Sequence, residues 1–331
     1  MKTNLITTLG LMLIAGISFI PISVKAQESV QFFRPNDKLG INVFETSKKD
    51  TVPFTGLKVK VGGNFELTFQ ALGESNTAIS VTKPGFTGNV NSLTNLTHGF
   101  VLPMANLNFD IQLADGIRMN LTNYLASRHH EDSWVKGGYI QFDKLLFLHS
   151  AVIDSIMKSV SIRIGQNDVD YGDQHYRRSD GGNTIYNPFV ENYIMDEFST
   201  ELGAQFYYFN KSGLFLMAGV TDGLLSETVV ASAKVDAVTG KPLTYQPAFL
   251  GKIGFDKQVN KDFRFRLTGS IYTVSSDFSN TLLGGDRTGS HYYNLMENQA
   301  VANGTTLNDA VDYNFTSGRV NPGFSNEIHA F

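Results

Sequence analysis

The sequence predicts an all-β protein, an antiparallel transmembrane β-barrel, and three observations lead to this prediction. An apolar leader precedes the rest of the chain, long segments alternate between apolar and polar residues, and the connections between them alternate between long and short. Side chains on a strand point alternately to the two faces of a sheet, so each segment has one apolar and one polar wall. In a transmembrane barrel the apolar wall faces lipid and the polar wall faces a watery lumen.

The first 26 residues have the pattern of a secretory signal peptide. Lys2 opens a short basic region, residues 5–24 are almost wholly apolar, and the small residue Ala26 precedes the expected cleavage site. A retained membrane anchor is the alternative. We expect residues 1–26 to be removed, residues 27–56 to form an N-terminal periplasmic segment, and residues 57–331 to form the barrel.

Composition excludes several classes of protein. The sequence has no cysteine, which excludes a lipoprotein anchor, a thiolate nucleophile and zinc held by cysteine. After the leader, 25 basic residues face 31 acidic ones, so nothing suggests nucleic acid as a partner. No later apolar run approaches the ~20 residues of a transmembrane helix. The 25 phenylalanines, 13 tyrosines and 31 glycines instead favour an exported, β-rich protein.

The strands follow from the alternation. The clearest is residues 57–72, where Leu57, Val59, Val61 and Phe65 alternate with Lys58, Lys60 and Asn64. Residues 106–113 and 117–122 repeat the pattern around a tight turn. Further strands are expected near 134–142, 159–166, 200–209, 214–220, 248–256 and 263–274. Residues 143–158 are expected to form either a short helix or a distorted hairpin.

The connections support a membrane barrel over other β folds. Long links at 73–102, 167–199, 222–247 and 275–324 alternate with short ones, so one end of a meander has tight turns and the other has long loops. Bacterial outer-membrane barrels have this layout. A soluble β-sandwich and an extracellular β-solenoid are the alternatives. Strands of about ten or more residues exceed the usual five to six of a soluble sheet and disfavour both.

Six cations fall on the inferred polar wall, and we predict that they line a pore. A basic wall raises the local concentration of anions and eases their passage. Alternatively, these cations pair with carboxylates on loops and only stiffen the wall. They are Lys58, Lys60, Arg118, Arg163, Arg264 and Arg266.

The stretch DYGDQHYRRSDGG, residues 170–182, lies on the third long loop. If that loop folds into the barrel, His175, Arg177, Arg178 and Asp180 would form a pore constriction. An active site is the rival interpretation, but the sequence shows no nucleophile paired with a base and no G-x-S-x-G elbow. The histidines of RHHED, residues 128–132, read as a solvated loop rather than a metal site. We therefore expect neither enzymatic activity nor a cofactor nor a metal.

The leader, the wall arginines, and RIGQNDVDYGDQHYRRSD leading into STELGAQFYYF together resemble outer-membrane porins of Bacteroidetes, and more distantly phosphate-selective porins. This resemblance implies passive diffusion of small hydrophilic or anionic solutes through a homotrimer of barrels. The barrels would sit in the lipid and lipopolysaccharide of a Gram-negative outer membrane. Phosphate-selective members stack many arginines and lysines in the pore, whereas this loop has one arginine pair followed by Asp180.

Two other functions and one question of length stay open. The long loops would suit a binding or adhesion barrel, and residues 27–56 would suit the small plug of a fatty-acid-type transporter. Porins of this type have about 16 strands, whereas about ten are counted here. The ending SNEIHAF also places Ser325, Glu327 and His329 on the same face as Phe331. We therefore expect the barrel to continue beyond Phe331.

Overall fold

A computed structural model of the chain describes most of the residues after the leader. The described residues are 29–46, 48–49, 52–71, 73–93, 98–125, 133–177, 183, 186, 199–224, 229–230, 233–236, 239–277, 282, 301–302, 305–306 and 326–331. The predicted signal peptide, the RHHED segment, Arg178 and Asp180 lie outside them. In the described part, no helix is long and apolar enough to cross a membrane.

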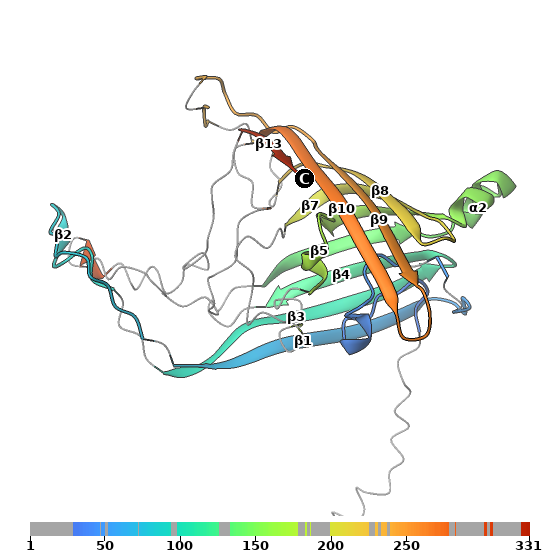
Figure 1. Cartoon of the computed structure of the whole chain (residues 1–331), viewed down its shortest axis with the longest axis horizontal. Coiled ribbons are helices and arrows are strands. Elements are labelled where there is room, and N and C mark those ends of the chain that lie inside the picture. Colours follow the sequence, from blue (N-terminus) through green and yellow to red (C-terminus); the bar gives the residue numbers. More distant parts are fainter. Residues whose placement is uncertain are drawn as a thin grey trace, which may run out of the picture.

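Ten strands form one antiparallel sheet, in which each of the ten pairs with the next of the ten in chain order (Figure 1). The strands are β1 (Lys58–Gln70), β3 (Gly99–Ala114), β4 (Ile117–Leu125), β5 (Ser133–Phe142), β6 (Val160–Asp168), β7 (Thr200–Phe209), β8 (Leu214–Thr221), β9 (Ala248–Gln258), β10 (Arg264–Asp277) and β13 (Asn326–Ala330). A second, small sheet joins β2 (Phe86–Thr87), β11 (Val301–Ala302) and β12 (Thr305–Thr306). The all-β, antiparallel prediction is confirmed.

The predicted strands coincide with the observed ones, except for β3. The prediction begins that strand at residue 106, but pairing with β1 starts at Gly99, opposite Gln70. Residues 99–105 do not alternate clearly, and Pro103 lacks the N–H that a ladder needs. The register between the two strands shifts opposite Pro103, between Glu66 and Thr68. An irregularity at this point lets the strand continue past the proline.

The connection between β5 and β6 is helical. It contains a single 3-10 turn, η2 (Leu146–Leu148), followed by the short helix α2 (Ala151–Met157). Ser150 is the N-cap, and its hydroxyl accepts a hydrogen bond from the backbone N–H of Ile153. The structure therefore decides between the two predicted alternatives for 143–158 in favour of the helix.

The sheet has its polar face inside and its apolar face outside. Polar side chains on one face are buried, and Gln112 and Gln205 are 1% and 0% exposed. Large apolar side chains on the other face are open, and Leu67 and Leu267 are 63% and 66% exposed. Soluble proteins show the opposite distribution. Other open side chains on that face are Val59, Phe65, Phe69, Phe206, Leu216, Val220, Phe249, Ile253, Phe265 and Ile271.

Two segments cover the polar face. One is the N-terminal segment, residues 29–55, which includes the 3-10 turn η1 (Lys38–Gly40) and is blue in Figure 1. The other is the inserted loop, residues 169–177, which ends in η3 (Gln174–Arg177). Glu45 contacts Arg266 on β10, while Lys48 contacts Asp143 after β5. Glu45 and Lys48 are close in the sequence, yet their partners are separated by the five strand steps from β5 to β10. In a flat sheet five steps would span about 24 Å. The sheet therefore curls around the N-terminal segment.

Candidate functional site

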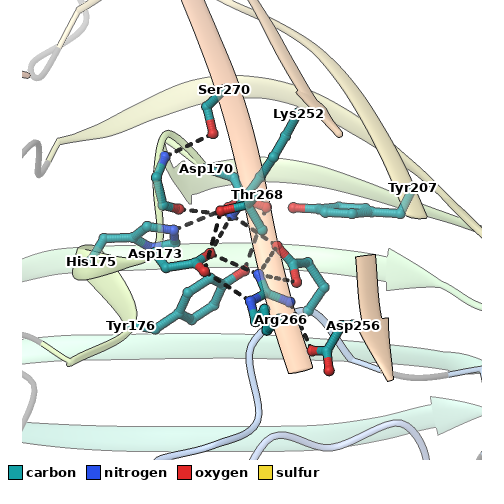
Figure 2. Close-up of polar contacts among 12 residues, drawn as sticks. Asp170, Asp173, His175, Tyr176, Tyr207, Lys252, Asp256, Arg266, Thr268 and Ser270 are labelled. Atoms are coloured by element: carbon teal, nitrogen blue, oxygen red, sulfur yellow. Dashed lines mark hydrogen bonds and ion pairs between the residues drawn. The ribbon is translucent and has the colours of Figure 1, made fainter. Parts of the chain in front are cut away.

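A cluster of buried charges joins the two inserted segments to the sheet. Its centre is Lys252 on β9, whose side chain is 0% exposed. The Lys252 Nζ lies 2.9 Å from Glu45 Oε1, 2.7 Å from Asp170 Oδ1 and 3.0 Å from Asp173 Oδ1. It also donates to the backbone oxygen of Gly172, at 2.7 Å. Figure 2 shows Lys252, Asp170 and Asp173 converging on one point. We call these residues, together with Glu45, the charge cluster.

Arg266, on β10 beside Lys252, completes the charge cluster. Its Nη2 lies 2.7 Å from Asp173 Oδ1 and 2.9 Å from Glu45 Oε2, and its Nη1 lies 2.9 Å from Asp256 Oδ2. The planar guanidinium therefore bridges the sheet, the inserted loop and the N-terminal segment, a role that suits its fork of donors. It also stacks over the ring of Phe44, at 4.0 Å from the ring centroid.

The carboxylates of the charge cluster differ in their pKa. Burial opposes ionisation of Asp170, but Lys252 and His175 hold the pKa of this carboxyl far below its ordinary value. For Asp173, the hydrogen bond from Arg266 and the charge of Lys252 outweigh burial and lower the pKa to about 2. Burial and the negative charge of Asp170 raise the pKa of Glu45. Acid will therefore protonate Glu45 before the two aspartates.

A polar cavity of about 130 Å³ lies beside the charge cluster, between the sheet and the inserted segments. Amides dominate its wall, and it reaches from β1 to β6. Its lining residues are Arg34, Asn36, Asn64, Asn106, Asn108, Asn120, Thr122, Lys136, Gly137, Tyr139, Gln166, Asp168, His175, Tyr176 and Asn183. Asn106 Nδ2 donates to Asn64 Oδ1 at 3.0 Å, and Thr122 Oγ1 donates to Asn108 Oδ1 at 2.9 Å.

The six predicted wall cations lie on the polar face, and each contacts other groups there. Arg264 and Arg266 pair with Asp256. Arg118 and Arg163 both donate to Gln141 Oε1, at 2.9 Å and 3.1 Å. Lys58 and Lys60 meet the N-terminal segment. Lys58 Nζ donates to the backbone oxygen of Ser29 at 3.2 Å, and Lys60 Nζ lies 4.2 Å from the ring centroid of Phe33. Arg266 shows the alternative pairing with a loop carboxylate, Asp173, whereas the partner of Arg264 lies on β9. The pore-lining role stays a prediction.

The inserted loop folds onto the polar face, as a pore constriction would require. His175 Nε2 lies 3.1 Å from Asp170 Oδ1, and Arg177 Nη2 donates to Asn42 Oδ1 at 3.1 Å. Gly172 N–H donates to the hydroxyl of Ser270 on β10, at 3.0 Å. The structure brings His175 and Arg177 into the interior, whereas Arg178 and Asp180 lie outside the described residues. Whether the loop constricts a pore stays a prediction.

Sequence reasoning missed the centre of the site. Lys252 was not singled out, although it occupies an inward position of the predicted strand 248–256, beside Leu250 and Gly254, and the alternation could have placed it on the inner face. Glu45 and Arg34 carry no such signal, because the N-terminal segment has no periodic pattern. In the described residues, no group of three or more potential ligands could hold a metal ion.

Comparisons with known proteins add no relative. No protein-family model matches the chain, and no curated protein or solved structure is significantly similar to it. The resemblance to Bacteroidetes porins therefore stays a prediction that rests on the sequence pattern. The functional interpretation depends on the geometry of the sheet and of its interior.

Proposed function

We propose that this protein is an outer-membrane β-barrel channel for the passive diffusion of small hydrophilic solutes. The observation that carries the proposal is the inverted sheet, polar inside and apolar outside. Burying ten large apolar side chains is worth about 15–30 kcal/mol relative to water. That exceeds the about 5–15 kcal/mol of net stability of a typical domain. A lipid environment takes these side chains out of water without requiring another protein surface to cover them.

A closed barrel is part of the proposal. An open sheet edge in lipid would leave backbone N–H and C=O groups without partners. β1 and β13 are the two ends of the described strand order, so closure requires them to meet each other or further strands. A homotrimer is the assembly that the porin resemblance implies, and native mass spectrometry of the detergent complex would measure it.

The interior favours a narrow path with little preference for anions. The N-terminal segment and the inserted loop lie over the polar face, and the amide-lined cavity remains between them and the strands from β1 to β6. Lys252 and Arg266 are each surrounded by carboxylates. Such paired cations add little attraction for a passing anion, since their field is largely cancelled.

The N-terminal segment also favours a second candidate, a transporter with an internal plug of the fatty-acid type. Its occupation of the polar face is what a plug would do. An acyl chain needs an apolar path, however, and the cavity beside this segment is lined by amides. Uptake of a labelled long-chain fatty acid into proteoliposomes, above that of protein-free liposomes, would favour this candidate.

Planar-bilayer recording tests the proposal. Protein whose folding is verified by β-sheet circular dichroism and by heat-modifiable gel migration is expected to insert in discrete conductance steps. Under a salt gradient, the reversal potential is expected to stay near zero. Folded protein that gives no steps contradicts the channel. Steps with a strongly anion-selective reversal potential would retain the channel and refute its balanced interior.

A further inference from the structure

The amide-lined cavity has the features of a binding site rather than of a passive gap. Five strands from β1 to β6 form one wall, and the N-terminal segment and the inserted loop form the other. Its volume of about 130 Å³ is many times the ~10–15 Å³ that one water molecule requires. The space therefore suits a small organic solute.

The sheet side of the cavity is polar without a dominant charge. An amide presents both a donor and an acceptor, so a row of amides matches groups that also do both. Bonds between neighbouring strands hold this row in place: Asn106 to Asn64, and Thr122 to Asn108. A hydroxyl group donates one hydrogen bond and accepts others, so it can match such a row.

The charged residues of the lining do not form an anion site. Arg34 is engaged by backbone oxygens: its Nε donates to Val43 and its Nη2 donates to Tyr176 at 3.0 Å. Lys136 lies 5.7 Å from the ring centroid of Tyr124. Asp168 adds a carboxylate that repels anions. An inorganic anion would therefore find its two cationic neighbours directed elsewhere and an acidic group beside it.

His175 supplies a buried ring nitrogen without a described partner. Its side chain is 2% exposed, and its Nε2 faces the Asp170 carboxylate at 3.1 Å. A carboxylate only accepts, so Nε2 carries a proton and Nδ1 is the ring atom left for another partner. Among the described residues, this buried Nδ1 has no hydrogen-bond partner. A buried ring nitrogen of this kind favours a ligand that can hydrogen-bond to it, and a hydroxyl can do so as donor or as acceptor.

We propose that this cavity binds a neutral polyhydroxylated solute of monosaccharide size. The hydroxyls exchange hydrogen bonds with the amide row and with His175, and the rings of Tyr139 and Tyr176 offer apolar surface to the C–H faces of the sugar. The inference deepens the proposed channel and rests on it, because the channel is the route by which the solute reaches this interior site.

Calorimetric titration of the folded protein in detergent tests the site. The probes are glucose, galactose and mannitol, with inorganic phosphate and sodium benzoate as the contrasting anions. At least one polyol is expected to bind saturably, and neither anion to do so. Thr122→Val removes one hydroxyl and keeps the shape, and we expect it to raise Kd about fivefold. Asn36→Ala, on the N-terminal segment, should weaken binding in the same direction.

Thr268→Val is the matched control. Thr268 is also an inward threonine with a side-chain bond, to Asp173 Oδ2 at 3.3 Å, but it does not line the cavity. It should leave Kd unchanged. Saturable phosphate binding, or polyol binding that Thr122→Val and Thr268→Val affect equally, overturns the assignment.

Bilayer recording separates this inference from the channel. Conductance steps without any polyol binding refute the site and leave the channel intact. Polyol binding to folded protein that gives no steps refutes the channel and leaves the site. Within a working channel, the same polyol should reduce the conductance of the wild type at concentrations that leave Thr122→Val unaffected.

Discussion

Two parts of the polar face, from β1 to β6 and at β9 and β10, satisfy their buried polar groups in different ways. From β1 to β6 the side chains that line the cavity are largely amides and hydroxyls, although Lys58, Lys60, Arg118 and Arg163 also lie on this part of the polar face. At β9 and β10 the inward groups include Lys252 and Arg266, and the space above them is filled by inserted chain. The interior is therefore filled where carboxylates of the inserted chain reach buried cations of the sheet.

The reason lies in where each group finds its partner. Asn106 bonds to Asn64 on the neighbouring strand, so an amide can be satisfied within the sheet. Lys252 and Arg266 lie on adjacent strands, and the sheet offers them chiefly Asp256. The remaining carboxylates, Glu45, Asp170 and Asp173, come from the N-terminal segment and the inserted loop. Buried cations thus fix the position of these segments, because an unpaired buried charge is costly.

Removing the charge of Lys252 should destabilise the part of the polar face at β9 and β10, and we expect this to be the largest effect. Lys252→Met leaves Glu45, Asp170 and Asp173 close together in a buried site without their shared ammonium. We expect stability to fall by about 3–5 kcal/mol, measured as the urea midpoint of heat-modifiable gel migration. Trypsin should then cleave the loosened N-terminal segment at Lys38 or Lys49.

Two variants control for this change. Lys252→Arg keeps the charge and should retain most of the stability, even if its geometry differs. Lys58→Met alters another inward cation, which donates to the backbone oxygen of Ser29, and should shift stability by no more than about 0.5 kcal/mol. Equal losses for Lys252→Met and Lys58→Met would remove the distinction between the two parts of the polar face.

Neutralising Glu45 should loosen the N-terminal segment without disturbing the sheet. Glu45→Gln keeps the size of the side chain but removes its charge from Lys252 and Arg266. Because burial raises the pKa of this carboxyl, we expect little change in overall stability. The channel should conduct more, or flicker more often, because this segment narrows the interior. Lys38→Gln, an exposed change in the same segment, should leave the conductance at the wild-type value. Unaltered conductance in both variants would place the segment outside the solute path.

Much of the fold could be predicted from the sequence, because alternation is a local signal. Residues 200–209 were predicted as a strand, and β7 has these bounds. The start of β3 was missed because residues 99–105 lack that signal. The charge cluster was out of reach for a different reason. Arg266 could be placed on the polar face, but its partner Glu45 is 221 residues away in a segment with no periodic pattern.

Acid should produce the smallest effect, through the carboxylates of the inserted loop. Asp173 has its pKa lowered to about 2, and that of Asp170 is lower still. A depressed pKa contributes stability above the ordinary value near 4, and this contribution is lost as the pH falls toward the folded pKa. For Asp173 we expect a loss of no more than about 1 kcal/mol at pH 3, since its part-exposed side chain is screened by solvent. The pKa of Glu45 is raised, so its contribution has the opposite sign, and the stability of the protein should rise as the pH falls through that pKa.

The urea midpoint should therefore stay level or rise slightly between pH 7 and 5, and fall below about pH 4. Asp173→Asn removes one of the two titrating groups and should reduce the acid-induced fall, while lowering the midpoint at pH 7. If the fall below pH 4 is equally steep in Asp173→Asn, the acid sensitivity does not depend on Asp173.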